Sequence, residues 1–242
     1  MLKVIIPIAG SSELFNPSEY FYPKPLIEIN GRPMIEVVLD SLHEFSVPLD
    51  IIFIIRNEDA KKYYLENTLK ILAKNAGIVT LKKETKGALC SVLMAIDQVN
   101  DDDELLILNG DQIIDESFDA IYQYWQSNQS DGGLVTFRSV HPRWSYVKSE
   151  DGLVIETAEK KPISNYAIAG YYYTRSARDF FEAAFNVILN ENQINESYYI
   201  SSAFNELILK NKKINTYEID SDRYHSFYSP EKIKHYELQS RK

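Results

Sequence analysis

The sequence predicts an α/β fold in which helices flank a mixed sheet. Three short apolar runs, at residues 3–7, 51–55 and 105–108, have the length and composition of buried parallel strands. Segments with helical periodicity separate them, and strands that alternate with helices form a parallel sheet with right-handed crossovers. After Asp111 the predicted strands are shorter and several follow one another directly, which indicates an antiparallel second half.

Helical periodicity is clearest in the first third of the chain. A longer amphipathic stretch covers residues 57–76, and a shorter one covers residues 34–45. In the shorter one, four apolar residues share one helical face: Ile35, Val38, Leu39 and Leu42. Each segment therefore has an apolar stripe that can pack on the predicted sheet.

The second half is predicted to hold four short strands, two helices and a last strand. In chain order these are residues 133–138, 145–147, 153–159 and 166–173, then 177–189 and 200–211, then 214–219. In doubly wound sheets the ligand crevice lies beyond the carboxyl ends of the strands. This rule places the candidate site after Pro7, near residues 83–87 and at residues 109–111.

Length, composition and charge narrow the classes of protein that fit. The chain has 242 residues, of which 45% are hydrophobic and 25% charged, so it can bury one sizeable core. No repeat, low-complexity tract or Gly/Ser-rich linker interrupts it, and we expect a single domain over residues 1–242. The net charge of −9 argues against a nucleic-acid partner, because binding to a phosphate backbone needs clustered Lys and Arg.

The cysteine count and the hydropathy pattern bear on the compartment. Cys90 is the single cysteine, so an internal disulfide cannot form, which is typical of a reducing compartment. The sequence has no transmembrane run, and it opens on a strand-like segment at residues 2–6 with no charged lead or cleavage site. We therefore expect a cytoplasmic protein with no membrane partner.

Several motifs occur in a definite order along the chain. They are Val4-Ile5-Ile6-Pro7-Ile8-Ala9-Gly10, Tyr22-Pro23-Lys24-Pro25-Leu26-Ile27, Ile29-Asn30-Gly31-Arg32-Pro33-Met34-Ile35, Lys86-Gly87-Ala88-Leu89, Leu108-Asn109-Gly110-Asp111 and Glu159-Lys160-Lys161-Pro162. Together, from residue 1 to about 235, they resemble the sugar-1-phosphate nucleotidyltransferases, such as the glucose-1-phosphate thymidylyltransferase family. The resemblance implies a Rossmann-like mixed, mainly parallel sheet flanked by helices, of the nucleotidyltransferase and glycosyltransferase-A type.

The resemblance also implies a nucleotide site, with Lys24 and Asp111 as its catalytic residues. Lys24 matches the family's phosphate-binding lysine, and Asp111 matches the strand-end aspartate that binds Mg²⁺. A carboxylate suits this hard cation, which bridges phosphate oxygens. The other implied nucleotide-binding residues are Ala9, Gly10, Ser11, Ser12, Lys86, Gly87, Ala88, Asn109 and Gly110.

A second group of residues is implied on the acceptor side: Tyr146, Glu159, Lys160, Lys161, Gly170 and Glu196. The residues themselves leave other roles open. Paired lysines are often surface charge, Glu196 can cap the helix that follows it, and many of the 17 tyrosines must be core or surface residues. The alternative for Lys24 is a solvated loop lysine, and the alternative for Asp111 is a turn-forming aspartate. Three histidines show no metal-ligand spacing among themselves: His141, His225 and His235.

The phosphate loop departs from the family pattern. An active member typically has Gly-x-Gly-x-Arg, whereas this chain has Gly10-Ser11-Ser12-Glu13-Leu14. Ser12 replaces a glycine that permits close backbone approach, and Leu14 replaces an arginine that can donate two hydrogen bonds to phosphate. The carboxylate of Glu13 would repel a phosphate if it faced one. These changes remove groups that normally hold the triphosphate.

The second metal carboxylate is also missing from its expected place. Many relatives have an aspartate near the C-terminus, where this chain has His225-Ser226-Phe227-Tyr228-Ser229-Pro230-Glu231. Asp220 and Asp222 fall before the matching segment. The sequence thus supplies Asp111 alone for a clamp that usually has two carboxylates.

Three functions follow as hypotheses. The first is transfer of a nucleotidyl group from a nucleoside triphosphate to a sugar-1-phosphate or related phosphorylated metabolite, with release of pyrophosphate and with Mg²⁺, in surface-glycan biosynthesis. The second is a catalytically silent homologue that binds a nucleotide, a sugar or a protein partner. The third is a nucleotide-sugar-dependent glycosyltransferase, for which Asp220-Ser221-Asp222 matches an Asp-x-Asp motif by letters only. By analogy with relatives, the chain can also form a homo-oligomer.

Overall fold

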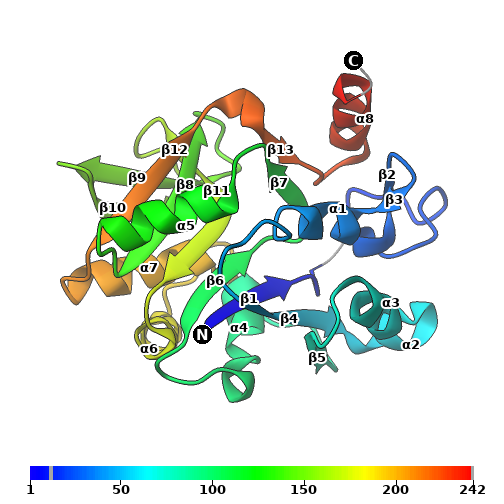
Figure 1. Cartoon of the computed structure of the whole chain (residues 1–242), viewed down its shortest axis with the longest axis horizontal. Helices are drawn as coiled ribbons and strands as arrows, with labels where there is room; N and C mark the ends of the chain where they lie inside the picture. The colour runs from blue at the N-terminus through cyan, green and yellow to red at the C-terminus, as the bar shows by residue number, and fades with distance from the viewer. Residues whose placement is uncertain (11–12, 241–242) are drawn as a thin grey trace.

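A nine-stranded mixed sheet runs through the whole molecule. The computed structural model describes residues 1–10 and 13–240. The strand order is β5-β4-β1-β6-β11-β8-β12-β10-β9, and helices cover both faces (Figure 1). The mixed sheet flanked by helices confirms the predicted fold class.

The first four strands of that order form the parallel half. They are β5 (Gly77–Leu81), β4 (Leu49–Arg56), β1 (Leu2–Pro7) and β6 (Glu104–Leu108). In β1, Val4 and Ile6 face one core while Ile5 faces the other, so both faces of the strand are buried. Leu2 pairs with both Leu49 and Glu104, so β1, β4 and β6 end at the same edge of the sheet. The three apolar runs predicted as buried parallel strands are confirmed.

The remaining strands pair mostly antiparallel. They are β11 (Tyr166–Thr174), β8 (Gly132–Arg138), β12 (Ile214–Ile219), β10 (Leu153–Glu159) and β9 (Ser145–Glu150). β11 joins the two halves because it pairs antiparallel with both β6 and β8. The exception is β12, which runs parallel to β8. Short strands form two small sheets beside the large one: β2 (Glu28–Ile29) with β3 (Arg32–Pro33), and β7 (Gln112–Ile114) with β13 (Tyr224–Ser226).

The helices form the two outer layers, each on its own apolar core. One core includes buried residues from α1 (Met34–Asp40), α3 (Leu65–Leu72), α5 (Phe118–Ser127) and α8 (Pro230–Gln239). The other includes buried residues from α4 (Ala88–Leu93), α6 (Ala177–Leu189) and α7 (Ile200–Leu209). The shorter helical elements are α2 (Asn57–Tyr63), η1 (Lys24–Leu26), η2 (Ile96–Gln98) and η3 (Ser221–Arg223).

Some element boundaries differ from the sequence-based prediction. The helix predicted over residues 57–76 is two helices, α2 and α3, because Tyr64 adopts a left-handed conformation with φ of 54° between them. The helix predicted over 34–45 ends at Asp40. The sequence reading did not predict α5 or α8, and in α8 only Ile233 is buried, so its apolar stripe is too weak to detect.

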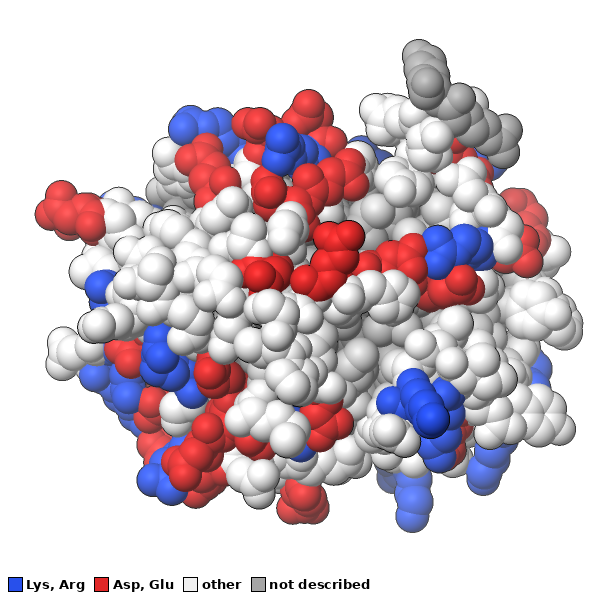
Figure 2. Space-filling view, viewed as in Figure 1, with Lys and Arg blue, Asp and Glu red and all other residues white. Residues whose placement is uncertain are grey.

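The surface view shows how charged side chains are distributed on one face of the molecule (Figure 2). Acidic side chains form a band across the middle of the face shown, over the region between α5 and α1 (Figure 2). Lys and Arg are scattered over the same face in small groups, one of them at the end of the acidic band. Among the described residues, no helix combines the length and the apolar character needed to cross a membrane.

Candidate active site

The first part of the candidate site lies where β1 and β6 end. A cavity of about 230 Å³, named here the Asp111 cavity, is lined by Pro7, Ile8, Gly10, Lys24, Pro25, Asn109, Gly110 and Asp111. Pro7 ends β1, and residues 109–111 directly follow β6, so the parallel strands deliver both segments to one edge of the sheet. Five of the residues predicted for the nucleotide site therefore lie together.

Lys24 and Asp111 form a direct ion pair in this cavity. The Lys24 Nζ donates to Asp111 Oδ2 at 2.5 Å. Lys24 is the first residue of η1 and stands between Pro23 and Pro25, whose rings restrict the backbone around it. Its Nζ also lies 5.9 Å from the ring centroid of Phe15. An entering phosphate would meet a lysine that already has a carboxylate partner.

A second cavity adjoins the first through Pro7 and Gly10. It measures about 270 Å³, is named here the Gly87 cavity, and is lined by Pro7, Ala9, Gly10, Glu84, Thr85, Gly87, Ala88, Ser91 and Ser197. Gly87 has a φ of 103°, and a Cβ there would lie 2.8 Å from the backbone nitrogen of Tyr198. The Tyr198 N–H donates to the carbonyl of Lys86 at 2.8 Å. Glycine at this position thus lets two backbone segments pass closely beside α4.

A third cavity lies on the antiparallel side of the cleft. It measures about 280 Å³, is named here the Glu159 cavity, and is lined by Ala88, Asn109, Asp111, Gln112, Arg143, Trp144, Ser145, Glu159, Ile168, Gly170, Tyr172, Tyr199, Ile200, Tyr224, Ser226 and Tyr228. It shares Asn109 and Asp111 with the Asp111 cavity and Ala88 with the Gly87 cavity. The three cavities therefore adjoin one another in one cleft, and Asp111 lines two of them.

Glu159 is a buried carboxylate with two hydroxyl donors. The Ser201 hydroxyl donates to Glu159 Oε2 at 3.0 Å, and the Ser145 hydroxyl donates to the same oxygen. Burial raises the pKa of Glu159, while the two serine hydroxyls and the nearby Lys160 charge oppose that rise. Among the described residues, the second carboxylate oxygen, Oε1, accepts no hydrogen bond.

Gly170 lies between the Glu159 cavity and the end of β6. It has a φ of 68° and lies in β11 where the pairing with β8 shifts register between Ile168 and Tyr172. A Cβ at this position would overlap the side-chain amides of Gln112 and Asn109. The Gly170 carbonyl accepts a hydrogen bond from the Asn109 N–H at 3.1 Å. Glycine is needed here so that the two amide side chains can lie beneath the strand.

Several predicted site residues lie elsewhere. Tyr146 is fully buried in a core and donates its hydroxyl to the carbonyl of His141 at 2.6 Å, so the proposed contact with substrate is corrected to a packing role. Lys161 and Glu196 are exposed and line none of the three cavities, which places both outside the cleft. Lys86 contributes its backbone carbonyl rather than a cavity-lining side chain.

Lys160 lies at the margin of the cleft. The Lys160 Nζ donates to the Tyr199 hydroxyl at 2.7 Å, and Tyr199 lines the Glu159 cavity. Lys160 has a φ of 54°, so its side chain leaves the chain at a turn rather than along a strand. Ser11 and Ser12, predicted to bind the triphosphate, lie outside the described residues.

The sequence did not predict that residues 226–228 lie beside Asp111 in the cleft. The Phe227 N–H donates to the backbone carbonyl of Asp111 at 2.7 Å, which places Ser226 and Tyr228 in the Glu159 cavity. The hydroxyl of Tyr224 donates to Gln112 Oε1 at 2.7 Å, and burial raises the pKa of that phenol well above its ordinary value. The sequence feature that could have indicated this is the segment 225–231, because it stands where many relatives have the second metal-binding aspartate.

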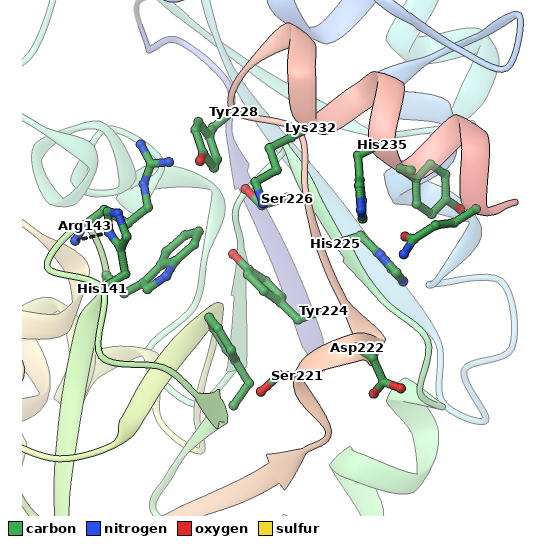
Figure 3. A pocket seen from close by; sticks show the side chains of 14 residues that line it. His141, Arg143, Ser221, Asp222, Tyr224, His225, Ser226, Tyr228, Lys232 and His235 are labelled. Carbon is green, nitrogen blue, oxygen red and sulfur yellow. Dashed lines mark hydrogen bonds between the residues drawn. The ribbon is translucent and has the colours of Figure 1, made fainter.

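A fourth cavity opens from the Glu159 cavity toward the C-terminal helix. It measures about 350 Å³, is named here the α8 cavity, and is lined by Phe137, His141, Arg143, Trp144, Ser221, Asp222, Tyr224, His225, Ser226, Tyr228, Lys232, His235, Tyr236 and Gln239 (Figure 3). The Arg143 guanidinium carbon lies 3.3 Å from the centroid of the Tyr228 ring. Partial burial lowers the pKa of Arg143, whereas the nearby Tyr224 and Asp111 raise it.

The donor set around Asp111 bears on metal binding. No cluster of three or more His, Cys, Asp or Glu side chains suited to a metal ion occurs within residues 1–10 and 13–240. Mg²⁺, however, is commonly held by one or two carboxylates together with substrate phosphates. Asp111, with the neutral oxygens of Asn109 and Ser226 nearby in the same cleft, fits an ion that is shared with a nucleotide.

Curated relatives resemble most of this chain but are longer. The bifunctional protein GlmU of Methanocaldococcus jannaschii is 29% identical over 182 residues, which cover 71% of this chain and 39% of the relative. The bifunctional sugar-1-phosphate nucleotidylyltransferase/acetyltransferase of Sulfurisphaera tokodaii is 29% identical over 185 residues, covering 72% of this chain and 41% of the relative. The chain thus spans about two fifths of the length of these relatives.

A solved structure matches over the full length. The nucleoside-diphosphate-sugar pyrophosphorylase of Vibrio cholerae RC9 superimposes with a TM-score of 0.85 at 27% identity, covering 98% of this chain and 100% of that one. The family model described as nucleotidyl transferase matches residues 3–221, which include the Asp111, Gly87 and Glu159 cavities except for the 224–228 segment. This chain belongs to the nucleotidyl transferase family.

Proposed function

We propose that this chain transfers a nucleotidyl group from a nucleoside triphosphate to a sugar-1-phosphate or related phosphorylated metabolite. One observation carries the proposal: the Asp111 cavity and the Glu159 cavity meet at Asn109 and Asp111. Two substrates bound on the two sides of the cleft would therefore bring their phosphates together at Asp111. Membership in the nucleotidyl transferase family supports the same reaction class.

The chemistry requires positioning and neutralisation of charge. An oxygen of the acceptor phosphate attacks the α-phosphorus of the nucleotide, the bond to the β-phosphate oxygen breaks, and pyrophosphate leaves with that electron pair. Lys24 would hold phosphate and stabilise the charge that develops as the bond breaks. The buried Glu159 would accept a hydrogen bond from a hydroxyl of the sugar. Gly87 would let the nucleotide approach the backbone beside α4.

We further propose that Mg²⁺ is the metal and that Asp111 holds it together with the nucleotide. When bound, the ion would neutralise phosphate charge. Because Lys24 already pairs with Asp111, nucleotide binding must separate the two side chains so that Asp111 faces the metal and Lys24 faces phosphate. The remaining parts of the proposal are one domain, a cytoplasmic location, a role in surface-glycan biosynthesis and the capacity to form a homo-oligomer.

The direct test is release of pyrophosphate, measured with Mg²⁺ across panels of nucleoside triphosphates and sugar-1-phosphates. We expect turnover with at least one pair, and a loss of about 100-fold or more in Asp111→Asn, since a group that acts on phosphate charge is removed. Asp97→Asn, an exposed aspartate in η2, is the matched control and should retain activity. Undiminished turnover in Asp111→Asn would refute the metal assignment.

One observation favours a second function, a silent homologue that binds a nucleotide or nucleotide sugar without turnover. Glu13 and Leu14 are both exposed in the loop after β1, so neither is committed to the core and neither supplies a phosphate donor. Calorimetric binding without pyrophosphate release would support this function. A glycosyltransferase gains no support, because Asp222 lines the α8 cavity and not the Asp111 cavity.

A further inference from the structure

The α8 cavity extends the acceptor side of the cleft away from the reacting centre. It shares Arg143, Trp144, Tyr224, Ser226 and Tyr228 with the Glu159 cavity, so the two cavities adjoin along this wall. The reacting phosphate must lie near Asp111, because the Asp111 cavity and the Glu159 cavity meet there. Whatever occupies the α8 cavity is therefore a part of the acceptor remote from that phosphate.

The walls of this cavity carry two cations without an anionic partner. Among residues 1–10 and 13–240, neither Arg143 nor Lys232 forms a salt bridge, although the chain has a net charge of −9. Figure 3 shows Lys232 extending from α8 toward Ser226, while Arg143 reaches toward Tyr228 from the opposite wall. Two unpaired cations on facing walls form a site for an anion.

Three carboxylates lie near these cations, Asp111, Asp115 and Asp222, and among the described residues none forms a salt bridge with Arg143 or Lys232. Asp111 acts electrostatically on Arg143 but is itself paired with Lys24, and Asp115 is hydrogen-bonded to His225 Nε2 at 2.7 Å. His141 and His235 line the cavity as well, and neither adds negative charge. Asp222 is the one lining carboxylate, and Figure 3 shows it on the side of the cavity away from Arg143 and Lys232.

The position of the lysine is fixed by the way α8 is held. Ile233 of α8 is buried in a core, and the side chain of Glu237 accepts a hydrogen bond from the Asn30 N–H at 2.8 Å. The Asn30 amide also donates to the hydroxyl of Ser240 at 2.9 Å. These contacts attach α8 to the hairpin of β2 and β3, so the wall that presents Lys232 is anchored at both of its ends.

We infer that the acceptor carries a second anionic group, a carboxylate or a phosphate, that binds in the α8 cavity between Lys232 and Arg143. The inference rests on the proposed function, because it assigns the cavity to the acceptor of that reaction. The rings of Trp144 and Tyr224 line the passage and would pack against the body of the acceptor. A hexose 1-phosphate whose sugar carries no further charged group would leave the two cations without an anionic partner.

The test compares three acceptors that share one scaffold: glucose 1-phosphate, glucuronic acid 1-phosphate and glucose 1,6-bisphosphate. We expect at least one of the two compounds with a second anionic group to have a higher kcat/KM than glucose 1-phosphate in the wild type. The better of the two shows whether a carboxylate or a phosphate is preferred. In Lys232→Gln, the KM for that compound should rise about 10- to 100-fold, the usual value of a hydrogen bond to a charged group, while glucose 1-phosphate is unaffected. Equal kcat/KM for all three acceptors would overturn the inference.

A matched lysine separates this site from a general effect of surface charge. Lys234→Gln changes an exposed lysine of the same helix that does not line the cavity, and it should leave all three kcat/KM values unchanged. Arg143→Lys keeps the charge and removes the planar donor pair, so it should weaken binding of the doubly anionic acceptors. If Lys232→Gln and Lys234→Gln behave alike, the α8 cavity is not the site.

Failure of the proposed function would be distinguishable from failure of the inference. If no acceptor releases pyrophosphate, the proposed reaction is wrong, and calorimetry with the same three compounds still tests the cavity. Tighter binding of a doubly anionic compound, lost in Lys232→Gln and kept in Lys234→Gln, would support an anionic ligand. Absence of any difference between the three compounds would overturn it.

Discussion

The two walls of the cleft differ in how they are prepared for a ligand. On the parallel wall, Lys24 is the cation that lines the Asp111 cavity, and it is already bound to Asp111. On the antiparallel wall, Glu159 is fixed by two serine hydroxyls, and Arg143 has no ion-pair partner among the described residues. If the proposed function is correct, the Lys24–Asp111 pair on the parallel wall separates when phosphate enters, whereas Glu159 on the antiparallel wall already has its hydrogen bonds.

The difference shows that one molecule can keep the residue positions that the fold determines and yet lack side chains that its relatives use to bind phosphate. The positions of Gly10, Asn109 and Asp111 follow from where β1 and β6 end, so the fold alone fixes them. Tight binding of phosphate depends on hydrogen-bond donors in the loop after β1, and the side chains of Glu13 and Leu14 are not donors.

Removal of the one cation on the parallel wall should have the largest effect. In Lys24→Met, kcat for pyrophosphate release should fall by about 10²- to 10³-fold, because the charge on the leaving phosphate loses its donor. Lys70→Met, at an exposed lysine paired with Glu66, is the matched control. An equal response of the two variants would mean that Lys24 is not part of the reaction.

A methyl group at Gly87 should have the largest effect on stability. Gly87→Ala combines a positive φ with a close backbone contact to Tyr198, and we expect a loss of about 2–4 kcal/mol in the free energy of unfolding. Gly152→Ala has a positive φ of 78° but open space around its Cβ, and should lose only about 1 kcal/mol. Urea unfolding of both variants measures the difference, and equal losses would show that the contact with Tyr198 is not tight.

The buried carboxylate of the acceptor wall should show itself in the pH dependence of stability. Because the pKa of Glu159 is raised in the folded state, its contribution to stability is complete below the ordinary value of 4.5 and is lost as pH rises through the higher folded value. The free energy of unfolding of the wild type should therefore fall relative to Glu159→Gln over that range. Glu156→Gln, exposed on the same strand, should show no such trend; a flat difference for Glu159→Gln would mean its pKa is not raised.

The smallest expected effect distinguishes a core tyrosine from a cleft tyrosine. Tyr146→Phe removes a buried hydrogen bond to His141 and should cost about 1 kcal/mol of stability with no change in the KM for the acceptor. Tyr199→Phe, in the lining of the Glu159 cavity, should raise the acceptor KM and leave stability nearly unchanged. Steady-state kinetics and urea unfolding of both variants give the four values, and an altered acceptor KM in Tyr146→Phe would return this residue to the site.

Much of the fold could be predicted from sequence because its strands have strong local signals. The apolar runs of β1, β4 and β6 are buried on both faces, so they are read directly as hydrophobic segments. The break at Tyr64 could not be predicted, because a tyrosine with φ of 54° has no signal comparable to glycine or proline. Likewise, α8 has one buried residue, so tertiary contacts decide its existence.

The candidate site was predictable where it is built from strand ends. Lys24 and Asp111 are 87 residues apart, and ordered motifs placed both at one edge of the sheet. Side-chain direction was not predictable: Tyr146 points into the core and Lys161 into solvent, although both lie in segments that border the cleft. Arg143 and Tyr228 come together only because the fold places the segment before β9 against the segment after β13.

A structure of the protein with the nucleotide sugar formed in the turnover panel tests the central claim most directly. The proposed function predicts the diphosphate at Asp111 with Lys24 released from its carboxylate, and the sugar against Glu159. It also predicts that the base lies beside Gly87 and Ala88. A nucleotide sugar that binds outside the cleft, or that leaves the Lys24–Asp111 ion pair intact, would contradict it.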